Sequence, residues 1–443
     1  MTAPAPSPAP AGAVDRACAA LRRAVLAHDR ALPERLAALL AADPAHVRGW
    51  ALKAIFAMTL ARAELLPAAT QAAETARAGL RSGAGRPGDA AYVRAAEHLT
   101  RGDWTAAIAA LDSAIDRDGA DSLAVKLAHS LRFMLGDAEG MARSIDGALT
   151  RIDAAHPDFG FLLGCRAFAL EETFRFGEAE RSGRAALERE PTDAWGLHAV
   201  SHVHEMTGRA GEGLAWIAAH PAAVESCNNF RFHLSWHEAL FRLELDDAAG
   251  ALSLYDGAIR AERSDDFRDI ANAASLLRRL ELAGLAVGDR WEELGDLCAR
   301  RVADRSLVFA DLHYVMALAG AGRIDSAETL ARSLAAAPAR SLEQTRRSRI
   351  GASLAAALID HEQGRFAACA ETMLSLRPEW PRLGGSHAQR DIFEQVMLDA
   401  MVRAGHPQAR ALLLTRLARR GGRNAFARLS LDRLAATPRR RAS

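Results

Sequence analysis

A short turn followed by an alanine-rich helical segment recurs along most of this 443-residue chain. Successive turns are 34, 38, 34, 38, 42, 34 and 42 residues apart, which is typical of the 34-residue tetratricopeptide period with short insertions. Such a unit predicts two antiparallel helices that bury their apolar faces against the next pair. The turns are GDWTAAI at Gly102, GDAEGMA at Gly136, FRFGEAE at Phe174, GRAGEGL at Gly208, DDAAGAL at Asp246, GDRWEEL at Gly288, GRIDSAE at Gly322 and GRFAACA at Gly364.

These repeats predict an all-α fold, a tetratricopeptide-type solenoid of about nine or ten helical hairpins in a right-handed superhelix. The clearest unit ends at Pro191, and Trp195 then opens the next helix. RSGAGRPGD at 81–89 is a break between hairpins, and no segment shows a strand pattern. We expect a Pro/Ala-rich disordered lead-in at 1–15, a single solenoid at 16–430 and a basic disordered tail at 431–443.

The charge balance gives no reason to expect a nucleic-acid or membrane partner. The chain contains 56 Lys and Arg residues and 55 Asp and Glu residues, and it has no stretch of about 20 apolar residues. Five scattered cysteines and an N-terminus without a signal-peptide pattern favour unpaired thiols and a cytoplasmic location. The arginine-rich C-terminus is interpreted as a solvated end; its arginines are Arg419, Arg420, Arg423 and Arg439 to Arg441.

Two His-x-x-x-His pairs lie 35 residues apart and are the strongest functional signal. His198/His202 and His233/His237 each place two rings on one helix face, and the offset brings the second pair to the equivalent position of the next repeat. Each face also carries a glutamate. These faces are predicted to line the concave side of the array, together with Trp195, Glu205, Trp236, Glu244 and, in the preceding repeat, Glu171.

Three interpretations of these histidines stay open. They can be groove residues satisfied by a carbonyl or water, as we also expect for His98, His129 and His204. They can act in acid–base chemistry. They can bind a metal ion, since imidazoles at i and i+4 with a carboxylate suit Zn²⁺. HAVSH and HLSWH lack the internal Glu of HExxH, however, and adjacent helices about 8–10 Å apart disfavour tight four-ligand closure.

Five long segments resemble the tetratricopeptide repeat protein 38 family over roughly residues 90–415. They are DAWGLHAVSHVHEMTGRAGEGLAWI (193–217), FHLSWHEALFRLELDDAAGALSLYD (232–256), ANAASLLRRLELAGLAVGDRW (271–291), FADLHYVMALAGAGR (309–323) and GGSHAQRDIFEQVMLDAMVRAG (384–405). The resemblance implies a soluble helical-repeat protein and imports no reaction. It directs attention to Asp256, Asp269, Asp311, His313, His387, Arg390 and Asp391. Asn272 and Arg278 depart from the expected pattern, which has an acid and an aromatic residue there.

A solenoid of this length can curl until distant repeats share one interior, so these groups are hypothesised to enclose a small-molecule cavity. We predict a binding protein for a small polar ligand or partner segment; a cavity enzyme and a scaffold without pocket chemistry are the alternatives. A homo-oligomer is possible, and the cofactor is unknown. The candidate catalytic residues are His198, His202, Glu205, His233, His237, His313, His387, Arg390 and Asp391. The candidate ligand-binding residues are Glu171, Trp195, His198, His202, Glu205, His233, Trp236, His237, Glu244, Asp269, His313, His387 and Arg390; the candidate metal ligands are His198, His202, His233 and His237.

Overall fold

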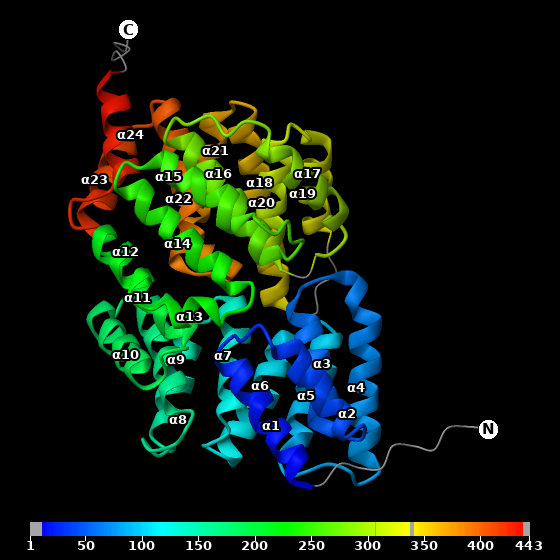
Figure 1. Ribbon diagram of the computed structural model, residues 1–443. Coiled ribbons are helices and arrows are strands. Elements are labelled where there is room, and N and C mark those ends of the chain that lie inside the picture. Colours follow the sequence, from blue (N-terminus) through cyan, green and yellow to red (C-terminus); the bar gives the residue numbers. More distant parts are fainter. Residues whose placement is uncertain (1–10, 306, 337–340, 437–443) are drawn as a thin grey trace. The chain divides into compact units, whose positions relative to one another are not determined.

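The computed structural model describes residues 11–305, 307–336 and 341–436, and these residues form helices without a named strand (Figure 1). An isolated bridge between Asp29 and Cys227 is the one β-type pairing among them. The predicted all-α array of repeated helical hairpins is therefore confirmed. The chain divides into two compact units, each described by itself below.

Unit 1 comprises residues up to Arg132, then 138–199 and 222–230. Its helices are α1 (Ala11–Leu26), α2 (Leu32–Ala42), α3 (Val47–Thr59), η1 (Ala63–Leu65), α4 (Leu66–Arg81), α5 (Asp89–Thr100), α6 (Trp104–Arg117), α7 (Ser122–Leu135), α8 (Ala138–Leu149), α9 (Phe159–Glu172), α10 (Phe176–Arg189) and α13 (Pro221–Glu225). The first half of α11 (Ala194–Met206) also belongs to it.

Unit 2 comprises residues 133–137, 200–221 and everything from Arg231 onward. After the second half of α11 come α12 (Ala210–Ala218), α14 (Phe230–Glu244), α15 (Ala248–Leu254), η2 (Tyr255–Ile259), α16 (Phe267–Leu282), α17 (Arg290–Arg301), α18 (Val308–Gly320), α19 (Ile324–Ala335), α20 (Leu342–Glu362), α21 (Phe366–Leu376), η3 (Arg377–Leu383), α22 (His387–Arg403), α23 (Ala409–Arg419) and α24 (Ala425–Ala436).

The hairpin turns share one backbone device. A residue in the left-handed region follows the first helix of a pair, where glycine costs least. Gly102, Gly136, Gly208, Gly322, Gly364 and Gly405 fill this position with φ between 67° and 75°. Phe174 and Asp246 occupy it with φ 62°, although neither is glycine. Seven of the eight predicted turns are therefore the points at which a first helix ends; the turn at Gly288 instead precedes α17, and Gly284, with φ 93°, follows the end of α16.

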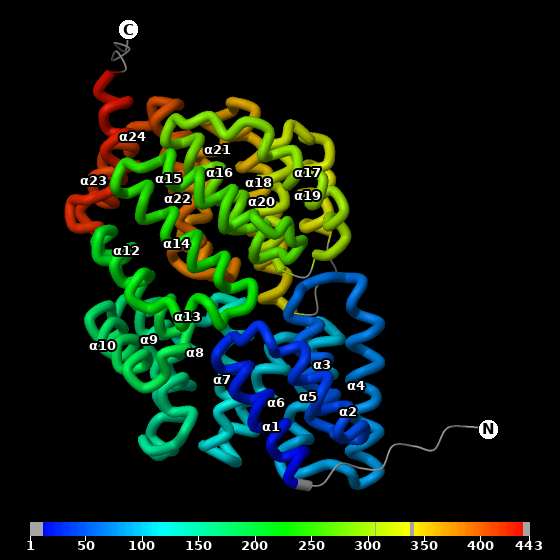
Figure 2. Tube along the Cα trace, viewed as in Figure 1, coloured from blue at the N-terminus to red at the C-terminus, as the bar shows by residue number. Residues whose placement is uncertain are grey.

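In unit 2 the first helices of the hairpins form the centre. α16 packs against both α18 and α22, and α20 packs against α18 and α22 (Figures 1 and 2). Fourteen of the sixteen residues of α16 are buried, against six of the twelve in its partner α17. A helix buried on nearly all sides must also bury its polar residues, and this is why α16 and α22 carry charged groups into the interior.

The hairpins of unit 2 curl until the first meets the last. Arg420, after α23, donates from Nη1 to the carbonyl oxygen of Glu205 in α11 at 3.2 Å, across 215 residues of sequence. A Cβ on Gly208, the turn after α11, would lie 2.2 Å from the Arg420 carbonyl oxygen, so only glycine fits there. Within unit 2, repeats that are far apart in the sequence are therefore in contact.

The helices extend further towards both ends of the chain than the sequence predicted. α1 begins at Ala11, inside the expected lead-in, because Val14 and Leu21 give it an apolar face that is buried. α24 reaches Ala436, inside the expected tail, because Phe426, Ala427 and Ser430 are buried. The remainder of both segments, 1–10 and 437–443, lies outside the described residues.

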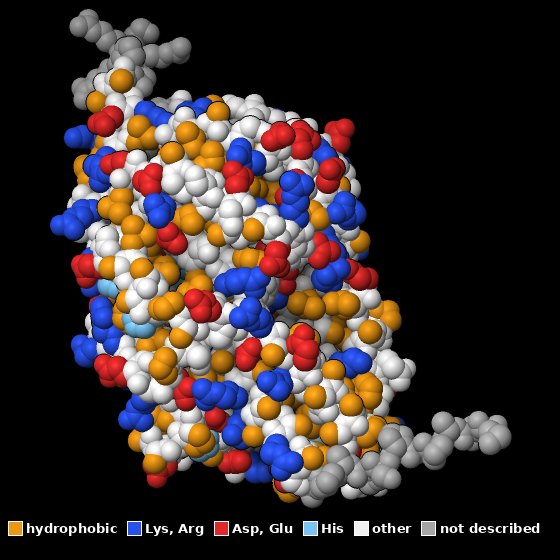
Figure 3. Space-filling model, viewed as in Figure 1, with side chains coloured by type: hydrophobic (Ala, Val, Ile, Leu, Met, Phe, Trp, Pro, Cys, Tyr) orange, Lys and Arg blue, Asp and Glu red, His pale blue; other side chains and the backbone are white. Residues whose placement is uncertain are grey.

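The structure bears on two further expectations, namely unpaired cysteines and no membrane-spanning helix. All five cysteines lie in the described part of the chain, and none forms a disulfide. Among the described helices, none combines the length and the apolar character that crossing a bilayer requires. Figure 3 shows acidic and basic side chains interspersed over the visible face.

Phe174→Gly is expected to stabilise the chain. A left-handed non-glycine residue costs about 1–2 kcal/mol, and the added freedom of glycine in the unfolded chain offsets part of that gain. The Phe174 side chain is exposed, so its loss removes little packing. Phe174→Ala is the control because it removes the ring and keeps the positive φ. Urea unfolding should rank the glycine variant about 1 kcal/mol above the alanine variant; equal stability would show that this turn is unstrained.

Candidate functional site

Two helices of unit 2 bring three of the predicted histidines together. His202 lies in the second half of α11, and His233 and His237 lie one turn apart on α14. The ring centroids of His202 and His237 are 4.7 Å apart, as are those of His233 and His237. The equivalent repeat positions of the two pairs therefore do become neighbours.

Two of these rings are oriented by oxygen acceptors. Nδ1 of His237 lies 3.1 Å from Oε2 of Glu205, and Nδ1 of His233 lies 2.8 Å from Oδ1 of Asn272 on α16. Since a carboxylate or amide oxygen accepts, each Nδ1 carries the proton and donates. Asn272 therefore does what a carboxylate would do, although the sequence marked it as a departure. Trp236 donates from Nε1 to Ser275 Oγ at 3.0 Å and fixes the same helix pair.

Burial sets the charge of this cluster. It lowers the pKa of His233 and of His237 well below the usual value, and neighbouring histidines lower both further. Burial also raises the pKa of Glu205, while Arg420 opposes that shift. At neutral pH the rings of His233 and His237 are accordingly neutral. The predicted histidine surface is thus a buried cluster.

A second polar group surrounds Asp391 on α22. Arg416 binds it with both Nη atoms, at 2.5 Å to Oδ1 and 2.8 Å to Oδ2. Arg420 adds a contact of 2.9 Å, and Arg279 of α16 lies 3.9 Å away. Burial alone would raise the pKa of the Asp391 carboxyl, but these guanidinium groups outweigh it and hold that pKa well below its usual range.

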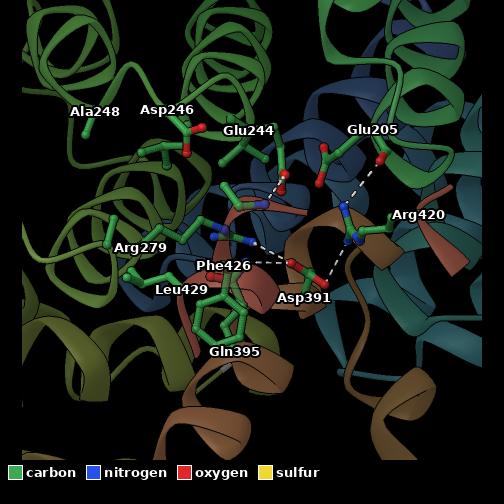
Figure 4. A pocket seen from close by; sticks show the side chains of 14 residues that line it. Glu205, Glu244, Asp246, Ala248, Arg279, Asp391, Gln395, Arg420, Phe426 and Leu429 are labelled. Atoms are coloured by element: carbon green, nitrogen blue, oxygen red, sulfur yellow. Dashed lines mark hydrogen bonds and ion pairs between the residues drawn. The ribbon is translucent and has the colours of Figure 1, made fainter. Parts of the chain in front are cut away.

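A cavity of about 240 Å³ lies between these elements in unit 2 (Figure 4). Its charged lining consists of four carboxylates and two guanidinium groups, and its apolar lining includes Leu240, Leu243, Phe426 and Leu429. The charged residues are Glu205, Glu244, Asp246, Asp391, Arg279 and Arg420. As far as the described residues define it, the lining of this cavity contains Glu205 and Glu244 of the predicted groove residues and no histidine. The rings lie behind Glu205 because they belong to the α11–α14 packing.

Glu244 shows how the lining is held in place. Its Oε1 accepts from Asn424 Nδ2 at 2.6 Å, and its Oε2 accepts from the backbone N–H of Ala425 at 2.9 Å. Burial raises the pKa of Glu244, and Arg420 opposes that shift. This carboxylate therefore anchors the start of α24 to α14 and also faces the cavity.

His198, the first member of the first histidine pair, belongs to unit 1, as do the candidates Trp195 and Glu171. His198 is buried against aromatic rings, with centroids 5.3 Å from Phe168, 5.0 Å from Trp195 and 5.0 Å from Phe230. Trp195 donates from Nε1 to His129 Nε2 at 3.1 Å, so His129 is a packing residue as expected. Glu171 is also fully buried in this unit.

The remaining candidates in unit 2 lie away from the cavity lining. His313 on α18 donates from Nδ1 to the Phe309 carbonyl at 2.8 Å. Arg390 bonds to the Gly384 and Gly385 carbonyls and to His387, and so closes the loop before α22. Asp256 pairs with Arg290 on the surface, Arg278 pairs with Glu362, and Asp269, Asp311 and His204 are buried.

The sequence interpretation missed the arginines. Arg420 was assigned to a solvated end, yet it is buried and bonded to Asp391 and to Glu205. This assignment was wrong because the curl of unit 2 folds the C-terminal hairpin onto α11. Arg416 and Arg279 are equally buried. In the sequence, only the position of such an arginine, on the inward face of a first helix or next to a turn, could have indicated its burial. Because the chain is rich in arginine, that signal is hidden.

Comparison with known proteins adds little to this geometry. No family model matches the chain. The solved structure of Naa15/Naa10 bound to HypK-THB is similar over 92% of this chain and 68% of that chain, with 13% identity and a TM-score of 0.26.

Asp391→Asn should destabilise the chain by about 3–5 kcal/mol, because it leaves three buried guanidinium groups without their carboxylate. Asp246→Asn is the control, since its side chain is 76% exposed and its pair with Arg428 spans 3.3 Å. That change should cost less than about 1 kcal/mol in urea unfolding. Similar small losses in both variants would mean that the Asp391 network contributes little.

The buried His313 should make the free energy of unfolding fall in acid. Burial lowers its pKa to about 4, below the unfolded value, so the unfolded chain binds the extra proton between pH 6.5 and 4. The stability it contributes is therefore present above pH 6.5 and is lost as the pH falls. His313→Gln keeps a donor for Phe309 and should reduce the loss between pH 7 and 5 by about 2 kcal/mol. An unchanged pH dependence in urea titrations would contradict a neutral, buried His313.

Proposed function

We propose that this chain is a helical-repeat binding protein whose unit 2 cavity takes a small organic cation, such as an ammonium compound with a short apolar part. The observation that carries the proposal is the excess of carboxylates in the lining, four against two guanidinium groups. Membership of the tetratricopeptide repeat protein 38 family remains a proposal that rests on the five motifs.

The guanidinium groups already have fixed acceptors. Arg420 bonds to Asp391 and to the Glu205 carbonyl, and Arg279 donates to the carbonyls of Ser275 and Ala388 at 3.2 and 3.0 Å. Burial lowers the pKa of Arg279 to about 10, which is still well above neutral pH. An incoming anion would therefore have to compete with these internal oxygens.

Glu205 and Glu244 are held by hydrogen bonds from His237, from Asn424 and from the Ala425 N–H, and burial acts against their charge. Burial raises the pKa of both Glu205 and Glu244, so their ionised forms are destabilised inside the protein. A bound ammonium group would stabilise those forms by direct ion pairing. Leu240, Leu243 and Phe426 supply an apolar wall for the rest of the ligand. The volume of about 240 Å³ is at the small end for ligand pockets, which suits a metabolite-sized cation.

Calorimetric titration of the full-length chain with a panel of aliphatic amines, diamines and matched carboxylic acids tests this proposal. At least one amine should bind, and Glu205→Gln and Glu244→Gln should each weaken it at least tenfold, about 1.4 kcal/mol. Asp296→Asn is the control and should change the affinity less than threefold, because this carboxylate is 62% exposed and does not line the cavity. Binding of the acids alone, or of no member of the panel, would contradict the proposal.

Acid–base catalysis in the same cavity is the second candidate. It is favoured by the buried contact of 3.1 Å between Glu205, which lines the cavity, and His237 behind it. Such a pair can hold and release a proton beside a bound molecule. Mass spectrometry of amines that bind should then show a product with the unaltered chain and none with Glu205→Gln or His237→Gln. Recovery of every ligand unchanged would leave binding as the function.

A further inference from the structure

The geometry points to a metal site beside the cavity, and we infer that His202, His233 and His237 bind one divalent transition-metal ion of the zinc class. This inference does not depend on the organic cation. One ring nitrogen from each of the three residues can be chosen so that all lie within 4.8 Å of one another. The sequence argument against closure considered helix axes, whereas the imidazoles extend from α11 and α14 towards each other.

The spacing is close to what a metal needs. Three nitrogens about 2.0–2.1 Å from a tetrahedral zinc ion lie roughly 3.4 Å apart. Bringing nitrogens that lie within 4.8 Å of one another to that separation requires the rings to rotate about their side-chain bonds. His233 and His237 are at i and i+4 on one helix, which presents both rings to the same point.

The hydrogen bonds of two rings select the tautomer that a metal requires. His237 donates from Nδ1 to Glu205, and His233 donates from Nδ1 to Asn272. In each neutral ring Nε2 is then the unprotonated nitrogen, which carries the lone pair. A ligand histidine held through its other N–H by a carboxylate or amide is the usual outer layer of a zinc site. Glu205 and Asn272 thus occupy the positions of supporting residues.

The electrostatic surroundings allow a divalent cation. Arg279 lies 3.9 Å from the carboxylate of Asp391, which offsets its positive charge. The Glu205 carboxylate adds a negative charge directly behind His237. Three imidazole ligands suit Zn²⁺ and leave a coordination position for water or a ligand atom.

Metal analysis of the full-length chain tests the site. The protein is stripped with a chelator, equilibrated with Zn²⁺ and dialysed, and bound zinc is measured by mass spectrometry. About one zinc per chain is expected. His233→Gln and His237→Gln should bind it at least tenfold more weakly, and Asn272→Ala should weaken it roughly tenfold through loss of ring orientation. His406→Gln, a half-buried histidine at the turn before α23, is the control and should keep full affinity.

Co²⁺ substitution keeps the test decisive if a buried variant does not fold. Circular dichroism identifies such a variant, and the unaltered chain then decides the question. Nitrogen ligation predicts tetrahedral visible bands without the near-ultraviolet thiolate band that a cysteine ligand would add. Less than about 0.1 zinc per chain, a thiolate band, or equal zinc uptake by folded His233→Gln and His237→Gln variants would overturn the inference.

Discussion

The constraint on which unit 2 depends is that a buried charge needs a fixed partner. Asp391 lies on a first helix that is buried along most of its length, and Arg416, Arg420 and Arg279 surround it. An isolated carboxylate in such a place would take up a proton, yet the three arginines keep this one ionised. Because the arginines come from α16 and from the C-terminal hairpin, the same contacts hold α16, α22 and that hairpin together.

This closure creates the candidate site. Glu205 meets Arg420 only because the hairpins curl, and Glu205 is also the residue shared by the cavity and the histidine cluster. The cavity presents raised-pKa carboxylates, while the cluster behind it presents neutral imidazoles of defined tautomer. Both features favour a cationic guest, an organic cation in the cavity and a metal ion at the rings.

The sequence predicted the hairpins because turn and helix signals are local. A residue with positive φ follows the end of each first helix. Gly102, Gly208 and Gly322 are such residues, and glycine is recognisable in the sequence. The in-phase histidines followed from the same periodicity, and His202 does approach His237. What could not be predicted is which far repeat lies opposite. The local sequence around Arg420 predicts an exposed side chain. The side chain is buried because the hairpins of unit 2 curl.

The protonation state of the two α14 rings tests this account most directly. A long-range nitrogen–proton correlation spectrum of the chain labelled with ¹⁵N-histidine, recorded near neutral pH without added metal, reports which ring nitrogen carries the proton. Spectra of His233→Gln and His237→Gln assign the two signals. The contacts with Asn272 and Glu205 predict neutral rings protonated at Nδ1 for both. Doubly protonated rings, or neutral rings protonated at Nε2, would contradict the buried, acceptor-held cluster on which the metal site is built.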